Sequence, residues 1–181
     1  MVGDAELYVD ADGAYSAKQA IRLGRVMADQ FDVTWFEEPV SSDDLPGLRR
    51  VRDGFDGDVA AGEYGYTLDY FANMITAGAV DCLQADVTRC GGVSVWRQVA
   101  ALADAHHLQI SGHCAPNLHA PVAASVPNLR HVEYFHDHHR IETMLFDGAL
   151  PPDGGVMTPD RSRPGHGLDF RETDAAHYRV A

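Results

Sequence analysis

Basic residues are scarce in this sequence. Its 181 residues include 14 lysines and arginines against 27 aspartates and glutamates, which gives a formal net charge of −13. Recognition of a phosphate backbone depends on clustered basic side chains, so this balance argues against a nucleic acid partner. No apolar run approaches the roughly 20 residues of a membrane-spanning helix, and no basic and apolar leader follows Met1. We therefore expect a cytoplasmic protein with no membrane partner.

Cysteine and aromatic residues are also few. The three cysteines, Cys82, Cys90 and Cys114, are odd in number and not closely paired, which argues against a disulfide framework and against a zinc site built on cysteines. We expect reduced thiols, mostly packed in the interior. The chain is 45% hydrophobic and long enough for a substantial core, so one domain is expected.

Short apolar stretches alternate with helix-like segments along the chain. The stretches typical of buried strands cover residues 6–10, 33–37, 59–63, 82–86, 108–113 and 130–135. Helical spacing of apolar residues follows a capping box at Ser16 and Gln19, and recurs over 43–52, 67–77 and 93–105. Repeated strand–helix units indicate parallel strands joined by right-handed crossovers.

Almost every predicted strand ends in a residue that can bind metal or move a proton. These residues are Asp10, Glu37, Glu63, Asp86, His113 and Glu133. In a (β/α) barrel the C-terminal ends of all strands converge on one mouth, whereas a doubly wound sheet spreads them along a line. We therefore predict an α/β fold, a TIM-type (β/α) barrel, with about six of its eight βα units present.

Three carboxylates from successive strands, Asp10, Glu37 and Glu63, repel one another unless a cation lies among them. Ligation by oxygen alone favours Mg²⁺, with Mn²⁺ possible and Zn²⁺ less favoured. The next two strand ends carry Asp86 and His113. They suggest a pair in which the carboxylate fixes the imidazole tautomer and His113 acts as a general base.

Glu133 completes this set. If it keeps its proton in a partly dry site, it can donate a hydrogen bond to an enolate. Together the six residues suggest that a proton is removed next to a carboxylate held by a metal ion.

Each of these features also has an ordinary structural explanation. Asp86 alone could cap the turn before "CGG", and His113 could be a hydrogen-bonded core histidine. The segment "HDHHR" (136–140) lacks the spacing of a known metal motif, so we expect a loop at the barrel mouth with at most one residue touching substrate. For Tyr64 and Tyr66, shaping of a pocket and plain packing are equally favoured.

The motifs "VDADGAY", "WFEEPV", "AAGE", "QADVTRCGG", "SGHCAP" and "HVEYF", with the tail "PGHGL", resemble the mandelate racemase branch of the enolase superfamily. They occur in the order expected for that family, across essentially the whole chain. The resemblance implies that the metal ligands are Asp10 of "VDA", Glu37 of "EEP" and Glu63 of "GE". Asp12 stands where relatives commonly have Asn and is expected to shape the pocket.

The same resemblance implies a catalytic group. Asp86, before "VTRCGG", matches the family's dyad aspartate, His113 of "SGH" matches its general base, and Glu133 matches its strand-8 glutamate. The muconate cycloisomerase branch has Lys at the position of Asp86, which argues against that branch.

Family members also carry an N-terminal capping domain and two further barrel strands before the point where this chain starts. The resemblance therefore implies that residues 1–181 are an incomplete enolase-type C-terminal barrel domain, with 148–181 as its closing tail. Such a domain is expected to form a homo-oligomer or to associate with a chain that completes the barrel.

The function implied by the resemblance is Mg²⁺-dependent abstraction of the proton α to a carboxylate through an enediolate. Dehydration of a small anionic sugar acid is the favoured reaction, in which His113 removes the α-proton and then protonates the departing 3-hydroxyl. The alternatives are a racemase or epimerase of a 2-hydroxy acid and a truncated, non-catalytic remnant.

Overall fold

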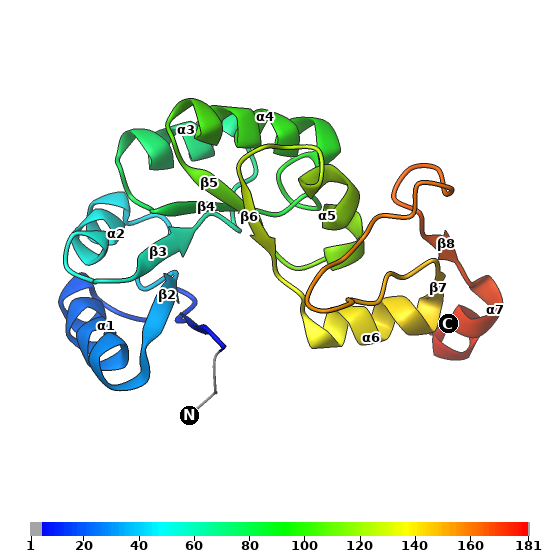
Figure 1. The fold of residues 1–181 in the computed structure, drawn as a ribbon, viewed down its shortest axis with the longest axis horizontal. Helices are drawn as coiled ribbons and strands as arrows, with labels where there is room; N and C mark the ends of the chain where they lie inside the picture. The colour runs from blue at the N-terminus through cyan, green and yellow to red at the C-terminus, as the bar shows by residue number, and fades with distance from the viewer. Residues whose placement is uncertain (1–4, 181) are drawn as a thin grey trace.

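The computed structural model describes residues 5–180, which contain a six-stranded parallel sheet in the order β1-β2-β3-β4-β5-β6 (Figure 1). The strands are β1 (Leu7–Asp10), β2 (Val33–Glu37), β3 (Asp58–Ala61), β4 (Cys82–Ala85), β5 (Gln109–Gly112) and β6 (Leu129–Val132). The rings of Tyr8 in β1 and His131 in β6 have centroids 5.4 Å apart, although these strands form opposite edges of the sheet. The sheet is therefore curled, and the predicted partial barrel is confirmed.

Helices follow the strands, and the first five cover the outer side of the curl, whereas the last two lie beyond β6 with the C-terminal segment (Figure 1). They are α1 (Ala17–Phe31), α2 (Leu45–Arg52), α3 (Leu68–Thr76), α4 (Gly92–Ala105), α5 (Pro116–Ala123), α6 (His136–Leu145) and α7 (Glu172–Ala175), followed by a 3₁₀ turn, η1 (Ala176–Tyr178). Two short antiparallel strands, β7 (Phe146–Asp147) and β8 (Asp169–Phe170), lie near the C-terminus. No helix in residues 5–180 is both long and apolar enough to cross a membrane.

The helix starts follow the local sequence. The predicted capping box is present at α1, where the backbone N–H of Ser16 donates to the Gln19 side chain at 3.1 Å. The Thr67 side chain accepts from the N–H of Tyr70 at the start of α3. At α4, Gly91 has a φ of 107°, a conformation that glycine adopts at little cost. Each of these three helices begins seven residues after the preceding strand ends.

The core lies between the convex face of the sheet and the helices. Its fully buried side chains include Leu48 of α2, Phe71 of α3, Trp96 of α4 and Leu83 of β4. A separate cluster of Trp35, Ala60 and Cys82 lies on the other face of the strands. Alternation along β2 and β3 therefore sends one set of side chains to the helices and the other into the barrel interior.

The loop predicted for residues 136–140 is wrong, because this segment forms the first half of α6. The N–H of His139 donates to the carbonyl of Phe135 at 3.0 Å, which begins the helical pattern. No residue of α6 is fully buried, so its sequence carries little of the apolar periodicity that reveals a packed helix. A partly buried polar contact helps to hold it: Asn117 of α5 donates to Glu142 of α6.

Helix α5 was not expected either. Pro116 at its first turn fits a helix start, but Pro121 inside it lacks an N–H and disfavours a helix in sequence-based reasoning. Six of its eight residues are buried, so tertiary packing outweighs the low intrinsic propensity.

Candidate active site

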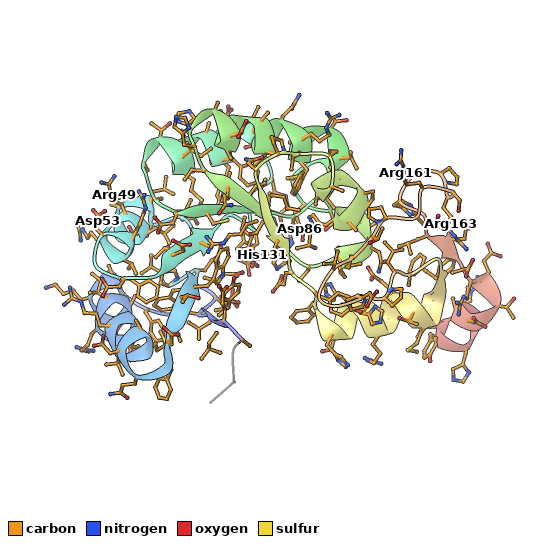
Figure 2. The ribbon with its side chains drawn as sticks, in the orientation of Figure 1. Arg49, Asp53, Asp86, His131, Arg161 and Arg163 are labelled. Carbon is orange, nitrogen blue, oxygen red and sulfur yellow. The ribbon has the colours of Figure 1, made fainter. Side chains whose placement is uncertain are left out.

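The predicted site residues lie at one end of the curled sheet, where the parallel strands finish. Asp10 and Glu37 are the last residues of β1 and β2 and are register partners. The other four follow β3, β4, β5 and β6 by one or two residues. Figure 2 shows Asp86 near the centre of the molecule, whereas Arg49 of α2 and Asp53, directly after that helix, lie at its periphery.

His113 and Asp86 form a close pair. His113 Nδ1 lies 2.9 Å from Asp86 Oδ2, and both side chains are almost fully buried. The other oxygen of Asp86 accepts hydrogen bonds from the N–H and hydroxyl of Thr88 at 2.7 and 2.6 Å. Burial alone would raise the pKa of Asp86, but the hydrogen bonds from His113 and Thr88 outweigh it and lower this pKa to about 2. Asp86 is therefore an ionised acceptor that fixes the imidazole.

The other nitrogen of His113 faces two more carboxylates. Nε2 lies 3.2 Å from Glu63 Oε2 and 3.8 Å from Glu133 Oε2. Burial opposes a charged imidazole, yet the Asp86 hydrogen bond and the charges of Glu63 and Glu133 together raise the pKa of His113. The structure thus brings Asp86, His113, Glu63 and Glu133 into one connected cluster.

Asp10 and Glu37 line a cavity of about 440 Å³ between the two edges of the sheet, together with Gln84 and Glu133. Burial is the largest cause that raises the pKa of Asp10, and the charges of Glu63 and Glu133 add to it. Burial and the charges of Asp10 and Glu133 raise the pKa of Glu37 to about 8, although Trp35 Nε1–H donates to Glu37 Oε2 at 3.1 Å. These carboxylates repel one another across the cavity.

This donor set fits a hard divalent cation, because it consists of carboxylate oxygens whose mutual repulsion such an ion offsets. Among residues 5–180, however, Asp10, Glu37 and Glu63 do not place three ligand oxygens within 4.8 Å of one another. Glu63 is drawn to positive partners instead, since its Oε1 lies 3.2 Å from Arg89 and its Oε2 lies beside His113. Within residues 5–180, His113 and Asp86 are in direct hydrogen-bond contact, whereas the oxygens of Asp10, Glu37 and Glu63 do not converge to within 4.8 Å.

Arg89 was missed from the sequence. It lies three residues after Asp86 in "TRCGG", and its guanidinium approaches both Glu63 and Asp86, the latter at 3.5 Å. It also lies 5.3 Å from the centroid of the Tyr64 ring, and the Tyr64 hydroxyl donates to Asp12 at 3.0 Å. The available sequence signal was an arginine three residues after the carboxylate at the end of a predicted strand, where its side chain can reach the site. Tyr64 and Tyr66 are both exposed, and Tyr64 meets Asp12 at the rim.

His119 is a second residue that sequence reasoning missed. This fully buried imidazole accepts from the N–H of Val87 through Nε2 at 3.0 Å. Its Nδ1 lies 2.8 Å from the carbonyl oxygen of Cys114. His119 therefore ties the loop after β4 to the loop after β5, and so positions Asp86 and His113 against each other.

Comparison with known proteins places this geometry in context. Residues 1–174 match the family described as Enolase C-terminal domain-like. The chain is 37% identical over 173 residues to a 3,6-anhydro-alpha-L-galactonate cycloisomerase of Streptomyces coelicolor, covering 93% of this chain and 46% of that protein. It is 31% identical over 171 residues to an L-talarate/galactarate dehydratase of Salmonella typhimurium, covering 94% and 41%.

Solved structures agree with this placement. A mandelate racemase/muconate lactonizing enzyme-like protein from Rubrobacter xylanophilus superposes with a TM-score of 0.92 at 46% identity, covering 97% of this chain and 49% of that one. An enolase from Bradyrhizobium, complexed with magnesium and mandelic acid, gives 0.89 at 31% identity, covering 98% and 47%.

The chain spans less than half the length of these relatives. The match nevertheless extends over nearly all of its own residues, from the first strand to α7. The resemblance inferred from the motifs is thus confirmed, and the chain belongs to the Enolase C-terminal domain-like family.

Proposed function

We propose that this chain carries part of the active site of a Mg²⁺-dependent enzyme that removes the proton α to the carboxylate of a sugar acid, leading to dehydration. The observation that carries this proposal is the buried His113–Asp86 pair, whose second imidazole nitrogen faces Glu63 and Glu133. Relatives described as an L-talarate/galactarate dehydratase and an arabinonate dehydratase support the substrate class.

His113 is the proposed base. Because Nδ1 is engaged by Asp86, Nε2 is the nitrogen left to accept the α-proton of a substrate. The ionised Asp86 stabilises the imidazolium that forms. The same imidazolium can then return its proton to the departing 3-hydroxyl, which leaves as water, and tautomerisation of the resulting enol gives a 2-keto-3-deoxy acid.

Two further roles follow from position. Glu133 Oε2 lies 3.8 Å from Nε2, and Glu133 is proposed to donate a hydrogen bond to the enolate that forms on the substrate. Asp10, Glu37 and Glu63 would hold Mg²⁺, or Mn²⁺ in its place. A bound Mg²⁺ supplies Lewis-acid stabilisation of the negative charge that develops on the substrate carboxylate.

Racemisation or epimerisation of a 2-hydroxy acid is the second candidate, since it begins with the same proton abstraction. A racemase from Streptomyces coelicolor with bound magnesium superposes with a TM-score of 0.88 at 31% identity, which favours keeping this reaction in the test. The two reactions differ after the first step: dehydration yields a keto acid, whereas epimerisation yields an isomer.

We further propose that residues 1–181 form an incomplete barrel domain, closed at its C-terminal side by residues 148–181. Within residues 5–180, β1 and β6 each have a single neighbour in the sheet, so both edges can pair with additional strands. A second copy of the chain, or another polypeptide, would complete the barrel.

The test is a screen of sugar acids in the presence of Mg²⁺, following both 2-keto acid and optical rotation. It is run on this chain and on a version extended upstream in its gene, with EDTA as the metal-free control. Keto acid that requires Mg²⁺ supports dehydration, and a change in rotation without keto acid supports epimerisation. If both forms bind Mg²⁺ and neither reaction occurs, the chain is a non-catalytic remnant and the proposed function is wrong.

A further inference from the structure

Cys114 brings a thiol into the space beside the proposed base. Its Sγ lies 3.3 Å from His113 Nε2 and 3.3 Å from Glu133 Oε2, and the ligand atoms of these three residues all lie within 4.8 Å of one another. No step of the proposed reaction uses this thiol. A nitrogen, a sulfur and an oxygen donor therefore lie close together, and the sulfur has no role in the proposed dehydration.

The spacing of these atoms matches a tetrahedral zinc site. Zinc–ligand bonds of about 2.0–2.3 Å, set at tetrahedral angles, place neighbouring ligand atoms about 3.3–3.6 Å apart. The three separations among Nε2, Sγ and the Glu133 oxygen are 3.3, 3.3 and 3.8 Å. Glu63 Oε2 lies 3.2 Å from Nε2 but does not belong to the group of ligand atoms that lie within 4.8 Å of one another, so a water molecule would supply the fourth ligand.

The position of the thiol is set by its backbone. Cys114 and Ala115 have φ values of 47° and 38°, a left-handed conformation that non-glycine residues rarely adopt. Hydrogen bonds hold the peptide there: the N–H of Cys114 donates to Glu133 at 2.9 Å, and its carbonyl oxygen lies 2.8 Å from His119 Nδ1. The donor set is therefore largely preorganised, which lowers the cost of binding.

We propose that a borderline or soft divalent cation, such as Zn²⁺ or Cd²⁺, binds through His113 Nε2, Cys114 Sγ and Glu133, with a water molecule as the fourth ligand. Binding deprotonates the thiol, and the proton is released to solvent. Thiolate and imidazole donors select these ions over Mg²⁺, which prefers oxygen. One consequence rests on the proposed function, in which His113 is the base. The bound ion occupies the Nε2 lone pair that accepts the α-proton, and therefore blocks turnover.

The test is an ultraviolet titration of the protein with Cd²⁺ in excess Mg²⁺, because cadmium thiolates absorb where free thiols do not. The wild-type chain is expected to develop the charge-transfer band with a plateau at one Cd²⁺ per chain, and Zn²⁺ should displace it. In Cys114→Ser the band should be absent, and Zn²⁺ affinity measured by calorimetry should fall at least about tenfold. Losing a residue that only supports a metal ligand already costs about this much, and Cys114 is proposed as a ligand itself.

Matched variants make the result specific. Cys90→Ser removes another buried thiol outside the cluster and should keep the band. Far-ultraviolet circular dichroism and thermal unfolding show whether each variant is folded. A wild-type protein without the band, or equal Zn²⁺ affinity in a folded Cys114→Ser, would overturn the inference and leave Cys114 as a hydrogen-bond donor that orients Glu133.

Failure of the proposed function gives a different pattern. Asp10→Asn removes a proposed Mg²⁺ ligand and is expected to lose turnover while keeping the Cd²⁺ band. If the protein develops the Cd²⁺ band but turns over no sugar acid, the inferred metal site stands and the proposed function fails. Loss of the band in folded Asp10→Asn would contradict a site built on Cys114.

Discussion

At the scale of single residues, His113 is defined by what surrounds it. One ring nitrogen is engaged by an ionised carboxylate, and the other faces two more carboxylates within 4 Å. The sequence predicted the members of this group, because the ends of parallel strands meet at one edge. It did not predict that Glu63 contacts Arg89, since that contact depends on how a loop 26 residues away folds back.

Replacing His113 separates catalysis from metal binding. His113→Asn removes the proposed base but no proposed Mg²⁺ ligand, so turnover should fall at least about a hundredfold while Mg²⁺ affinity stays near that of the wild type. Steady-state kinetics and calorimetry measure the two quantities. His106→Asn, at the exposed end of α4, is the matched control and should change neither. Comparable losses of turnover and Mg²⁺ affinity would show that the role of His113 is misassigned.

Asp86 makes a pH-dependent contribution to stability. Its pKa in the folded protein is depressed from 3.8 to about 2, so its stabilising effect is present above the unfolded value and lost as the pH falls through the folded one. At 1.36 kcal/mol per pKa unit, the effect is about 2 kcal/mol.

The difference in unfolding free energy between wild type and Asp86→Asn should therefore shrink by about that amount between pH 5 and pH 2. Urea denaturation across this range measures it, with Asp104→Asn on the exposed face of α4 as the control. A difference that stays constant over this range would mean that Asp86 is not preferentially ionised in the folded chain.

At the scale of elements, buried strands were predictable and two helices were not. Strands β2 and β4 consist of almost uninterrupted buried residues, which give a strong apolar run. Helix α6 is polar and α5 contains an internal proline, so neither has the signal that reveals a helix in a single sequence. Both depend on contacts between distant segments, in which Asn117 is central.

Asn117 links α5, α6 and the following segment. This fully buried amide donates to Glu142 and accepts from the N–H of Leu150 at 2.6 Å. Asn117→Ala should lower the free energy of unfolding by about 1–3 kcal/mol, because it leaves these partners without a hydrogen bond. Hydrogen exchange should accelerate over residues 136–150. The exposed Asn73→Ala is the control, and unchanged exchange in that segment would rule out the linking role.

At the scale of the whole molecule, β1 and β6 predict association, because no strand within residues 5–180 pairs with their outer sides. Each presents backbone N–H and C=O groups at an edge of the sheet, and such edges pair with other strands. Sedimentation velocity on the isolated chain should show a mass that rises with protein concentration. The version extended upstream should associate less through these edges. A chain that stays monomeric at every concentration would mean that the edges are otherwise protected.

The central claim is that the group at the rim of this sheet removes the α-proton of a sugar acid, and deuterium incorporation tests it most directly. Sugar acids are incubated in D₂O with Mg²⁺ and either wild type or His113→Asn, using the chain and its extended form, and are analysed by mass spectrometry. We predict deuterium in recovered substrate or product with wild type and none with His113→Asn. Equal incorporation by both proteins, or none by a wild-type protein that binds Mg²⁺ and substrate, would contradict the account.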